Sequence, residues 1–165
     1  MRVQAIEPGQ HAALADLTVA AYRALPGRPP SPEYTALLRD VDARARDAEV
    51  LVALDGDGVV LGGVTYVGDR GSSYAEFDGA DEAGFRMLAV APAAQGLGAG
   101  AALVAACIEL ARRDGKRRLT LLTTDGMAAA HRLYARFGFR RQPASDMMVA
   151  SGLQLRSFVL DLEED

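Results

Sequence analysis

The stretch Gln95-Gly96-Leu97-Gly98-Ala99-Gly100 decides the fold class of this chain. It follows an apolar run at residues 85–90, which is typical of a strand, and it opens an apolar-periodic stretch at residues 101–113, which is typical of a helix. Glycines at every second position leave main-chain N–H groups without side chains in front of them. At a helix N-terminus, unpaired N–H groups and the helix dipole attract anions. The stretch therefore predicts a diphosphate-binding loop, and with it a phosphorylated cofactor.

Length and composition predict a single globular domain over residues 1–165. Half of the 165 residues are hydrophobic and 24% are charged, so the chain is long enough to bury a core. The formal net charge of −4 argues against a dedicated nucleic-acid binder, because such domains are basic overall. We therefore expect no nucleic-acid partner.

Positive charge is concentrated in one part of the chain. Residues 112–141 contain nine Lys or Arg residues, against Asp114 and Asp125 as the acids. Two interpretations fit: a solvated surface, or a field that draws an anionic cofactor toward the half that carries the glycine-rich stretch. A nucleic-acid-associated protein that uses this cluster is a further alternative.

Cysteine and histidine usage predicts neither a disulfide nor a metal site. Cys107 is the only cysteine, and its place in the periodic stretch indicates a small buried hydrophobic side chain rather than a reactive thiol. His11 and His131 lie far apart and lack ligand spacing. Glu7 follows the N-terminus too closely for a signal peptide, and no apolar run approaches membrane-spanning length. We therefore predict a cytoplasmic protein with no membrane partner.

Hydrophobic spacing and turn residues predict one mixed α/β domain without repeats or linkers. Apolar or alternating runs predict strands at residues 3–6, 50–54, 59–67, 85–91, 119–123, 147–149 and 155–162. Helical spacing predicts helices at residues 10–25, 32–46, 98–114 and 127–137. Residues 69–84 are polar and glycine-rich, which is typical of a long loop or an irregular strand extension.

Taken alone, the glycine-rich stretch fits several kinds of nucleotide-binding loop. A P-loop ends in Gly-Lys followed by Ser or Thr, whereas Gly100 is followed by two alanines. A dinucleotide-binding fingerprint needs Gly-x-Gly-x-x-Gly and an acid about 20 residues further on. Here the spacing is Gly-x-Gly-x-Gly, and Asp125 lies about 25 residues past Gly100. Both of these alternatives are disfavoured.

Two motifs together resemble the GNAT superfamily of N-acetyltransferases. Residues 90–100, Val-x-Pro-x-x-Gln-Gly-x-Gly-x-Gly, are similar to the acyl-CoA loop of that family, commonly Arg/Gln-x-x-Gly-x-Gly/Ala. About 40 residues further on, residues 130–139, Ala-His-Arg-Leu-Tyr-Ala-Arg-Phe-Gly-Phe, resemble its second signature, a helical Tyr followed by Gly-Phe. The resemblance extends over residues 50–162. It implies a mixed, largely antiparallel central sheet of about six to seven strands, flanked by about four helices.

The resemblance implies a binding site for acetyl-CoA as the acyl donor. Main-chain groups of Leu88, Ala89 and Val90 would pair with the pantetheine arm as an additional strand does. Met127 and Ala130 would line the same site, and Met127 stands where the family often has Asn. The diphosphate would be held by the main-chain N–H groups of Gln95, Gly96, Leu97, Gly98, Ala99 and Gly100.

The resemblance implies that Tyr134 protonates the departing thiolate. A thiol has an ordinary pKa of about 8.5 and a tyrosine one of about 10, so a positioned phenol donates the proton without being charged beforehand. Alternatively, Tyr134 is a core residue, because it shares helical spacing with Met127, Ala130 and Phe137. The glycine-rich stretch upstream favours the acid.

Our prediction for the general base is Glu82. The family often has Glu two residues before the position of Arg86, where this chain has Gly84. Glu82 lies two residues further back, on the same strand face as Arg86, and would remove a proton from the acceptor ammonium directly or through a water. Solvated loop charges are the alternative explanation. Competing carboxylates nearby are Glu76, Asp78 and Asp81.

The sequence therefore predicts an enzyme that transfers an acetyl group from acetyl-CoA to a primary amine by direct attack, without a metal. The alternative is a non-catalytic acyl-CoA-binding sensor or regulatory module of the same fold, which Gly84 and Met127 favour. The acceptor stays open among small amines, antibiotics, peptide N-termini and lysine side chains. The resemblance implies that residues 25–34 and 144–155 shape its pocket. Members of the family often dimerise, so a homodimer is an open alternative.

Overall fold

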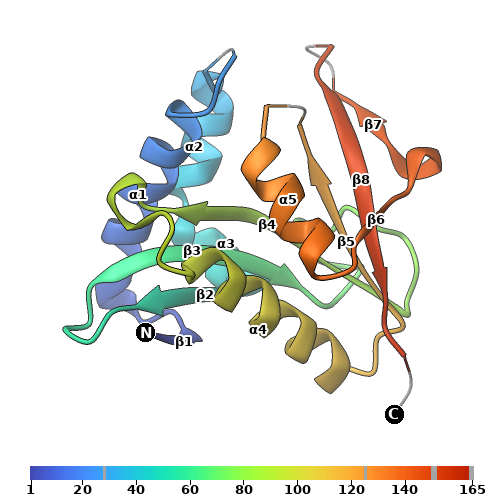
Figure 1. The fold of residues 1–165 in the computed structure, drawn as a ribbon, viewed down its shortest axis with the longest axis horizontal. Helices are drawn as coiled ribbons and strands as arrows, with labels where there is room; N and C mark the ends of the chain where they lie inside the picture. The colour runs from blue at the N-terminus through green and yellow to red at the C-terminus, as the bar shows by residue number, and fades with distance from the viewer. Residues whose placement is uncertain (28, 125, 150–151, 164–165) are drawn as a thin grey trace.

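The computed structural model describes residues 1–27, 29–124, 126–149 and 152–163, which are built around one eight-stranded sheet (Figure 1). The strand order is β1-β2-β3-β4-β5-β8-β6, with β7 paired to β8. All neighbours are antiparallel except β4 and β5, which are parallel. The strands are β1 (Arg2–Ala5), β2 (Glu49–Leu54), β3 (Val60–Val67), β4 (Glu82–Val90), β5 (Arg118–Thr123), β6 (Arg140–Arg141), β7 (Met147–Met148) and β8 (Gln154–Asp161).

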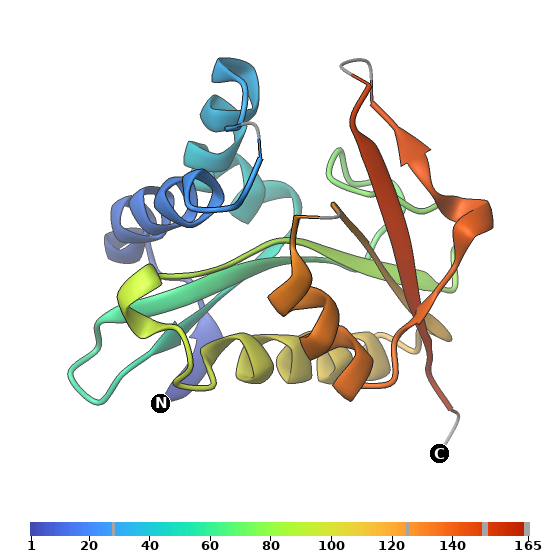
Figure 2. The same cartoon turned by 45° about the horizontal axis from the view of Figure 1, so that its top comes forward.

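Helices cover both faces of the sheet (Figure 2). α4 and α5 pack on one face, over a core that includes Phe85 and Leu103, and α1, α2 and α3 pack on the other, over Leu14 and Val52. Apolar residues at helical spacing provide these faces. In the described residues the α-helices are α1 (His11–Arg23), α2 (Pro32–Arg39), α3 (Val41–Asp47), α4 (Ala99–Arg113) and α5 (Ala128–Arg136). Within those residues, no helix is long and apolar enough to cross a membrane.

The predicted mixed α/β fold is confirmed, and the structure differs from the prediction in one strand boundary, in the number of strands and in one helix. The strand predicted from residue 85 begins at Glu82, because its first three residues pair with β5. The sheet has eight strands rather than the expected six to seven, because β6 was not predicted; a strand of two residues leaves no signal in hydrophobic spacing. β7 lies within the strand predicted at residues 147–149. The helix predicted at residues 32–46 is divided into α2 and α3.

The division between α2 and α3 lies at Asp40. Its backbone leaves the helical region, at φ −82° and ψ 67°, and its carboxylate accepts a hydrogen bond of 3.1 Å from the Ala43 N–H, which caps α3. The carbonyls at the end of α2 are satisfied by Arg44, which is buried and donates to Leu37 O at 3.1 Å and Leu38 O at 2.8 Å. A guanidinium is thereby held inside the protein.

The middle of β4 carries a β-bulge. Along the β3–β4 pair the register shifts so that Met87 and Leu88 lie opposite Val64 alone. Met87 has φ 55°, the single positive φ outside glycine among the described residues. An unbranched side chain tolerates this conformation only at a cost of about 1–3 kcal/mol, and such strained residues concentrate at functional sites. The bulge therefore marks this part of β4 as a candidate for the functional site.

The pairing of β4 with β5 is short. Only Glu82, Ala83 and Gly84 of β4 are paired with β5, although β4 continues to Val90 and β5 to Thr123. Beyond Gly84 the two strands separate, as Figure 1 shows. We call this point of separation the fork. The bulge and the C-terminal half of β4 lie beyond it.

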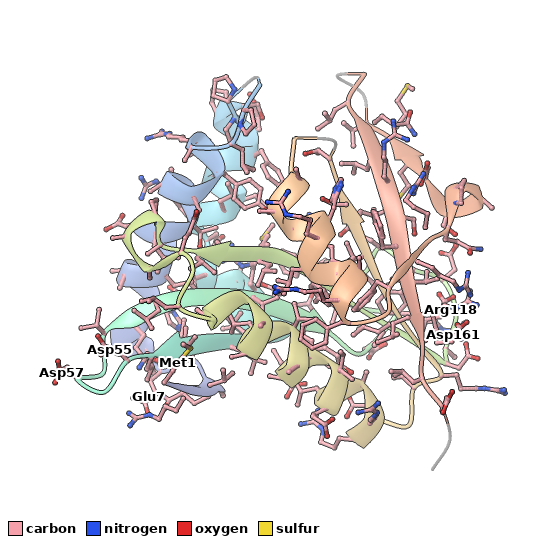
Figure 3. All side chains as sticks on the ribbon, in the orientation of Figure 1. Met1, Glu7, Asp55, Asp57, Arg118 and Asp161 are labelled. Carbon is pink, nitrogen blue, oxygen red and sulfur yellow. The ribbon has the colours of Figure 1, made fainter. Side chains whose placement is uncertain are left out.

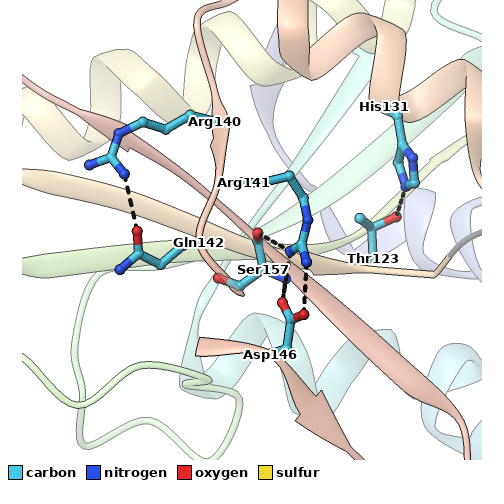
Figure 4. Close-up of polar contacts among 7 residues, drawn as sticks. All are labelled: Thr123, His131, Arg140, Arg141, Gln142, Asp146 and Ser157. Carbon is cyan, nitrogen blue, oxygen red and sulfur yellow. Dashed lines mark hydrogen bonds and ion pairs between the residues drawn. The ribbon is translucent and has the colours of Figure 1, made fainter. Parts of the chain in front are cut away.

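Polar contacts hold a turn and a strand pair on opposite sides of the molecule. In the β2–β3 turn, which contains Asp57, the Val59 N–H donates to the Asp55 carboxylate at 2.9 Å, and an ion pair of 2.9 Å between Arg118 and Asp161 joins β5 to β8 (Figure 3). Figure 4 shows the contacts around β6.

In that network the Arg141 guanidinium holds the Asp146 carboxylate at 2.7 and 2.8 Å, and the Ser157 N–H donates to Asp146 at 2.8 Å (Figure 4). These contacts lower the pKa of Asp146 to about 2.

Candidate active site

The glycine-rich loop has the open backbone that its sequence predicts. Gly96 and Gly98 have φ 84° and 90°, in the left-handed region that favours glycine. A Cβ at either position would meet no heavy atom within 4 Å, so the loop is bare on its outer side. Gly100 differs, because a Cβ there would lie 3.3 Å from Leu133 Cδ2. Its lack of a side chain allows α5 to approach α4.

The loop ends at an uncapped helix N-terminus. Gly98 is the N-cap of the 15-residue helix α4 and offers no side chain to its N–H groups. The Ala102 N–H donates to Gly98 O, so the N–H groups of Ala99, Gly100 and Ala101 lie at the open end of the helix. Gln95 and Leu97 beside them are exposed. Free N–H donors at the positive end of a helix dipole fit a diphosphate.

The strand edge beside this loop is open. Ala89 and Val90 pair with β3 on one side, and within the described ranges no strand pairs with the other side of residues 88–90. Leu88 and Val90 are half-buried against the core under α4. An extended ligand can add to such an edge through main-chain hydrogen bonds. Binding of a pantetheine arm at this edge stays a prediction.

Tyr134 faces the fork from α5. It is 5% exposed and its ring lies 5.9 Å from Phe85, 5.8 Å from Phe139 and 6.3 Å from Phe158, measured between centroids. Burial raises the pKa of its phenol, which therefore stays protonated through the neutral range. The pKa of Tyr22 in α1 is raised by burial, by Tyr34 and by Tyr134, so groups from both faces of the sheet come within electrostatic reach here.

On the opposite face, an ion pair lies directly before the bulge. Arg86 Nε is 3.4 Å from Glu76 Oε1, and the Arg86 guanidinium lies 5.9 Å from the centroid of the Tyr74 ring. Burial raises the pKa of Glu76, and the charge of Arg86 opposes this shift. A cavity of about 10 Å³, close to the space that one water needs, adjoins Glu76, Gly84 and Arg86. The sequence had indicated Glu76 only as one of several alternatives.

The structure does not bring Glu82 to the bulge. Glu82 lies where β4 and β5 are still paired, and its carboxylate accepts a hydrogen bond of 3.2 Å from the Gly79 N–H. Five residues of strand separate it from Met87, about 17 Å at about 3.3 Å per residue. Asp78 and Asp81 are exposed. The role of Glu82 as a base stays a prediction without geometric support.

At position 84, where the family often has Glu, the structure leaves no room for a side chain. A Cβ on Gly84 would lie 3.1 Å from Phe77 Cδ1 and 3.2 Å from Thr120 O. Phe77, from the loop before β4, therefore fills the space that a side chain at position 84 would need. The same loop supplies Glu76, so one segment replaces that side chain and brings another carboxylate to the sheet.

The start of α5 is tied to the end of β5. The Thr123 hydroxyl donates to Met127 Sδ at 3.1 Å. It also lies 3.2 Å from His131 Nε2, as Figure 4 shows. Met127 is the N-cap of α5, and Ala130 is half-buried against the core beside Tyr134. Thr123 was not singled out from the sequence, where an inward threonine in a strand gives no distinct signal. Direct contact of Met127 and Ala130 with a cofactor stays a prediction.

The other candidate features of the chain do not belong to the candidate active site. Cys107 is fully buried in α4, and burial raises the pKa of its thiol, in agreement with a core role. Throughout residues 1–27, 29–124, 126–149 and 152–163, no cluster of three His, Cys, Asp or Glu side chains could hold a metal ion. A groove of about 410 Å³ between α4 and β8, lined by Ile108 and Phe137, contains none of the predicted site residues.

Most of the basic cluster is paired with acids. Five of its nine members form ion pairs with Glu49, Glu109, Asp114, Asp146 or Asp161, which favours the interpretation as a solvated surface. Those five are Arg112, Arg113, Arg118, Arg140 and Arg141. Asp125 lies outside the described residues, as do residues 28, 150 and 151 of the segments expected around the acceptor pocket.

Comparisons with solved structures find the same fold. One is yncA from Salmonella typhimurium, which is described as an acetyltransferase and was solved with its cofactor acetyl-CoA. It is 26% identical to this chain, the match covers 99% of this chain and 95% of yncA, and the TM-score is 0.72. A GCN5-related N-acetyltransferase from Kribbella flavida is 23% identical, the match covers 98% of this chain and 97% of that protein, and the TM-score is 0.71. A ribosomal-protein-alanine N-acetyltransferase from Brucella melitensis is 23% identical, the match covers 98% of this chain and 100% of that protein, and the TM-score is 0.71.

A comparison with curated proteins found no match. The family model described as "Acetyltransferase (GNAT) family" matches residues 11–139, which is more than half of the chain and contains the glycine-rich loop, the bulge and α5. With this match and with the open strand edge beside an uncapped helix, the chain belongs to the acetyltransferase (GNAT) family.

Proposed function

We propose that this acetyltransferase moves the acetyl group of acetyl-CoA to a primary amine by direct attack of the amine on the thioester. The observation that carries the proposal is the open edge at residues 88–90, which lies between the uncapped N-terminus of α4 and the phenol of Tyr134. A diphosphate at the loop and an extended arm along the strand would form one continuous ligand. The bound acetyl-CoA in the structure of yncA supports this choice of donor.

When bound, acetyl-CoA supplies an acetyl thioester. The N–H groups of residues 95–100 would hold its diphosphate, and the main-chain groups of Leu88, Ala89 and Val90 would hold its arm. Met127 and Ala130 would line the side of the arm that faces α5. An N–H group near the bulge would donate to the carbonyl oxygen as it gains negative charge. These contacts orient the thioester toward the face that carries Arg86.

Glu76 and Tyr134 move the protons of this reaction. Glu76 takes one proton from the acceptor ammonium, and the free amine forms the C–N bond while the C–S bond breaks. Tyr134 gives its proton to the departing sulfur, which leaves as a thiol, and regains a proton from the acetylated nitrogen. The proton on Glu76 then passes to solvent, because its side chain is 24% exposed.

Glu76 replaces Glu82 as the base that we favour. Its raised pKa makes its carboxylate a stronger base than an ordinary Glu, and it lies next to Arg86 at the bulge. Glu82 satisfies the alternation of the strand, but it lies at the wrong end of β4. The pH–rate profiles of Glu76→Gln and Glu82→Gln separate the two carboxylates.

The rival function is a sensor that binds acyl-CoA without catalysis, as the absence of Glu at position 84 suggested. The test combines calorimetry with acetyl-CoA and detection of free CoA thiol in the presence of a panel of primary amines. Binding together with thiol release and a mass increase of one acetyl group on an amine supports the enzyme. Binding without thiol release from any amine supports the sensor. Absence of binding overturns both.

The acceptor, the assembly and the location are further proposals. The acceptor is open between a protein N-terminus, which is the class named for the relative from Brucella melitensis, and a small amine. A homodimer and a cytoplasmic location remain predictions. Size-exclusion chromatography with light scattering tests the first, and cell fractionation tests the second.

A further inference from the structure

Three buried polar atoms in the described residues lack a hydrogen-bond partner, and all three lie on the same face of the sheet. They are Arg44 Nε, Thr65 Oγ1 and Arg86 Nε. Thr65 and Arg86 are paired across β3 and β4, and the charge of Arg44 lies within electrostatic reach of Arg86. Buried polar groups are almost always paired, so a concentration of unpaired ones calls for a ligand or a water. Both guanidinium atoms are donors, and they need an acceptor.

The charges of this cluster are not balanced. Arg44 and Arg86 provide two guanidiniums, against one carboxylate, Glu76. Arg44 is 1% exposed, and its remaining donors are partly satisfied by the carbonyls at the end of α2. The contact between Arg86 Nε and Glu76, at 3.4 Å, is an ion pair without the alignment of a hydrogen bond. A group that carries negative charge is therefore favoured on the accessible side of Arg86.

The surroundings of Arg86 suit a small organic anion. The guanidinium lies over the Tyr74 ring, and its side chain is 19% exposed, so one side is accessible. Tyr22 of α1 and Tyr34 of α2 lie with their rings 6.0 Å apart above Met87, the next residue of β4. Aromatic walls lower the local dielectric and strengthen each charge contact. A planar guanidinium beside them binds a carboxylate in preference to a neutral amide.

The position of Arg86 relative to the reaction fixes the size of the ligand. Arg86 directly precedes the bulge, and Leu88, which we propose receives the thioester arm, is two residues further on. An acceptor carboxylate on Arg86 therefore leaves room for only a short link to the attacking amine. Glu76, at the side of Arg86, provides the opposite charge for an ammonium. A negative and a positive side chain in contact are the complement of a zwitterion.

We propose that the acceptor is a zwitterionic amine of the α-amino-acid type, with its carboxylate bound by Arg86 and its ammonium facing Glu76. This inference rests on the proposed acetyl transfer and names the substrate class of the same site. A peptide N-terminus is the competing class, because it has an amide where the carboxylate would be. Arg86 then binds and orients the acceptor, and contributes to its specificity.

The test compares each of the twenty common amino acids with its α-carboxamide, using release of CoA thiol from acetyl-CoA. We expect at least one free amino acid to react with a kcat/KM about 10- to 100-fold above that of its amide, the range for a lost hydrogen bond to a charge. In Arg86→Gln this preference disappears, because kcat/KM for the free acid falls further than kcat/KM for the amide, chiefly through a higher KM for the free acid. Arg86→Lys keeps part of the preference.

The control variant is Arg39→Gln, because Arg39 is an exposed arginine of α2 whose ion pair with Asp16 lies outside this cluster. It should react like the unmodified protein. Calorimetry with acetyl-CoA checks that Arg86→Gln still folds and binds the donor. Equal rates for acids and amides, or faster amides, overturn the inference while leaving acetyl transfer intact. A preference that survives in Arg86→Gln overturns the role of Arg86. Binding of acetyl-CoA without thiol release from any amine overturns the proposed function instead.

Discussion

Tyr134 shows why a single position can satisfy two interpretations of a sequence. Its helical spacing indicates a core residue, and its ring is indeed packed among Phe85, Phe139 and Phe158. The same packing holds the phenol beside the fork and fixes its orientation. Burial keeps it protonated, which a general acid needs before it acts. The two interpretations therefore do not exclude each other.

Tyr134→Phe should lower kcat about 100-fold or more, the usual contribution of a positioned acid or base, because the departing sulfur loses its proton donor. The dissociation constant for acetyl-CoA should change little, since the aromatic packing is retained. Steady-state kinetics and calorimetry measure the two quantities. Tyr66→Phe is the matched control, because its hydroxyl donates to Asp114 at 2.9 Å away from the fork. An unchanged kcat in Tyr134→Phe removes this residue from the mechanism.

Glu76 gives a prediction for the pH dependence. A base must be deprotonated to act, so kcat/KM should rise with pH as the Glu76 carboxyl loses its proton. Because burial raises its pKa, this rise should lie above the ordinary Glu range near 4.5. Glu76→Gln should remove the rise and lower kcat about 100-fold.

The matched variant for this test is Glu82→Gln, which should keep both the rise and the rate. A pH–rate profile of each variant decides between the two carboxylates. If Glu82→Gln loses the rise and Glu76→Gln keeps it, the base assigned from strand alternation is right and Glu76 is only a partner of Arg86. Retention of the rise in both variants points to a water relay without a carboxylate.

At the scale of elements, the loop before α4 depends on backbone conformation rather than on side chains. Gly98→Val forces a branched side chain into φ 90°, at a strain of about 1–3 kcal/mol, and places its methyl groups in front of the N–H donors. Affinity for acetyl-CoA should fall at least about 10-fold, beyond the loss of stability, because one blocked charge contact is worth that much. Calorimetry and thermal unfolding separate the two effects.

Gly58→Val is the matched control for the loop. Gly58 has φ 83° in the β2–β3 turn, and a Cβ there also meets open space. It should lose a similar amount of stability and none of its affinity. An equal affinity for acetyl-CoA in Gly98→Val and Gly58→Val would mean that the loop does not hold the diphosphate.

The elements also differ in whether the sequence alone predicts them. The glycine-rich loop and the helix of Tyr134 could be predicted because glycine spacing and helical periodicity are local signals. The bulge at Met87 and the fork after Gly84 could not, because register and strand separation depend on neighbouring strands. Glu76 was ranked below Glu82 for the same reason. Alternation along a strand gives the face of a residue, but not how far along the sheet the reaction occurs.

At the scale of the whole molecule, a ligand that spans both halves of the sheet should stabilise the fold. Acetyl-CoA at 100 times its dissociation constant contributes about 2.7 kcal/mol by mass action. For a domain of this size each kcal/mol raises Tm by about 2–4 °C, so we expect a rise of about 5–10 °C. Differential scanning calorimetry with and without the ligand measures it. Tm of Gly98→Val should rise less with acetyl-CoA. If Tm of the unmodified protein does not rise, acetyl-CoA does not span both halves of the sheet.

The separation of β4 from β5 has a consequence for which thioesters the protein tolerates. A strand edge offers donors and acceptors at a fixed repeat of about 3.3 Å per residue, so it measures the distance between the amides of whatever lies along it. Insertion of one methylene between two amides of the donor would misalign one of them, whatever acyl group it carries. Discrimination among donors at this edge would therefore act on the carrier, leaving the choice of acyl group to the side chains around Tyr134.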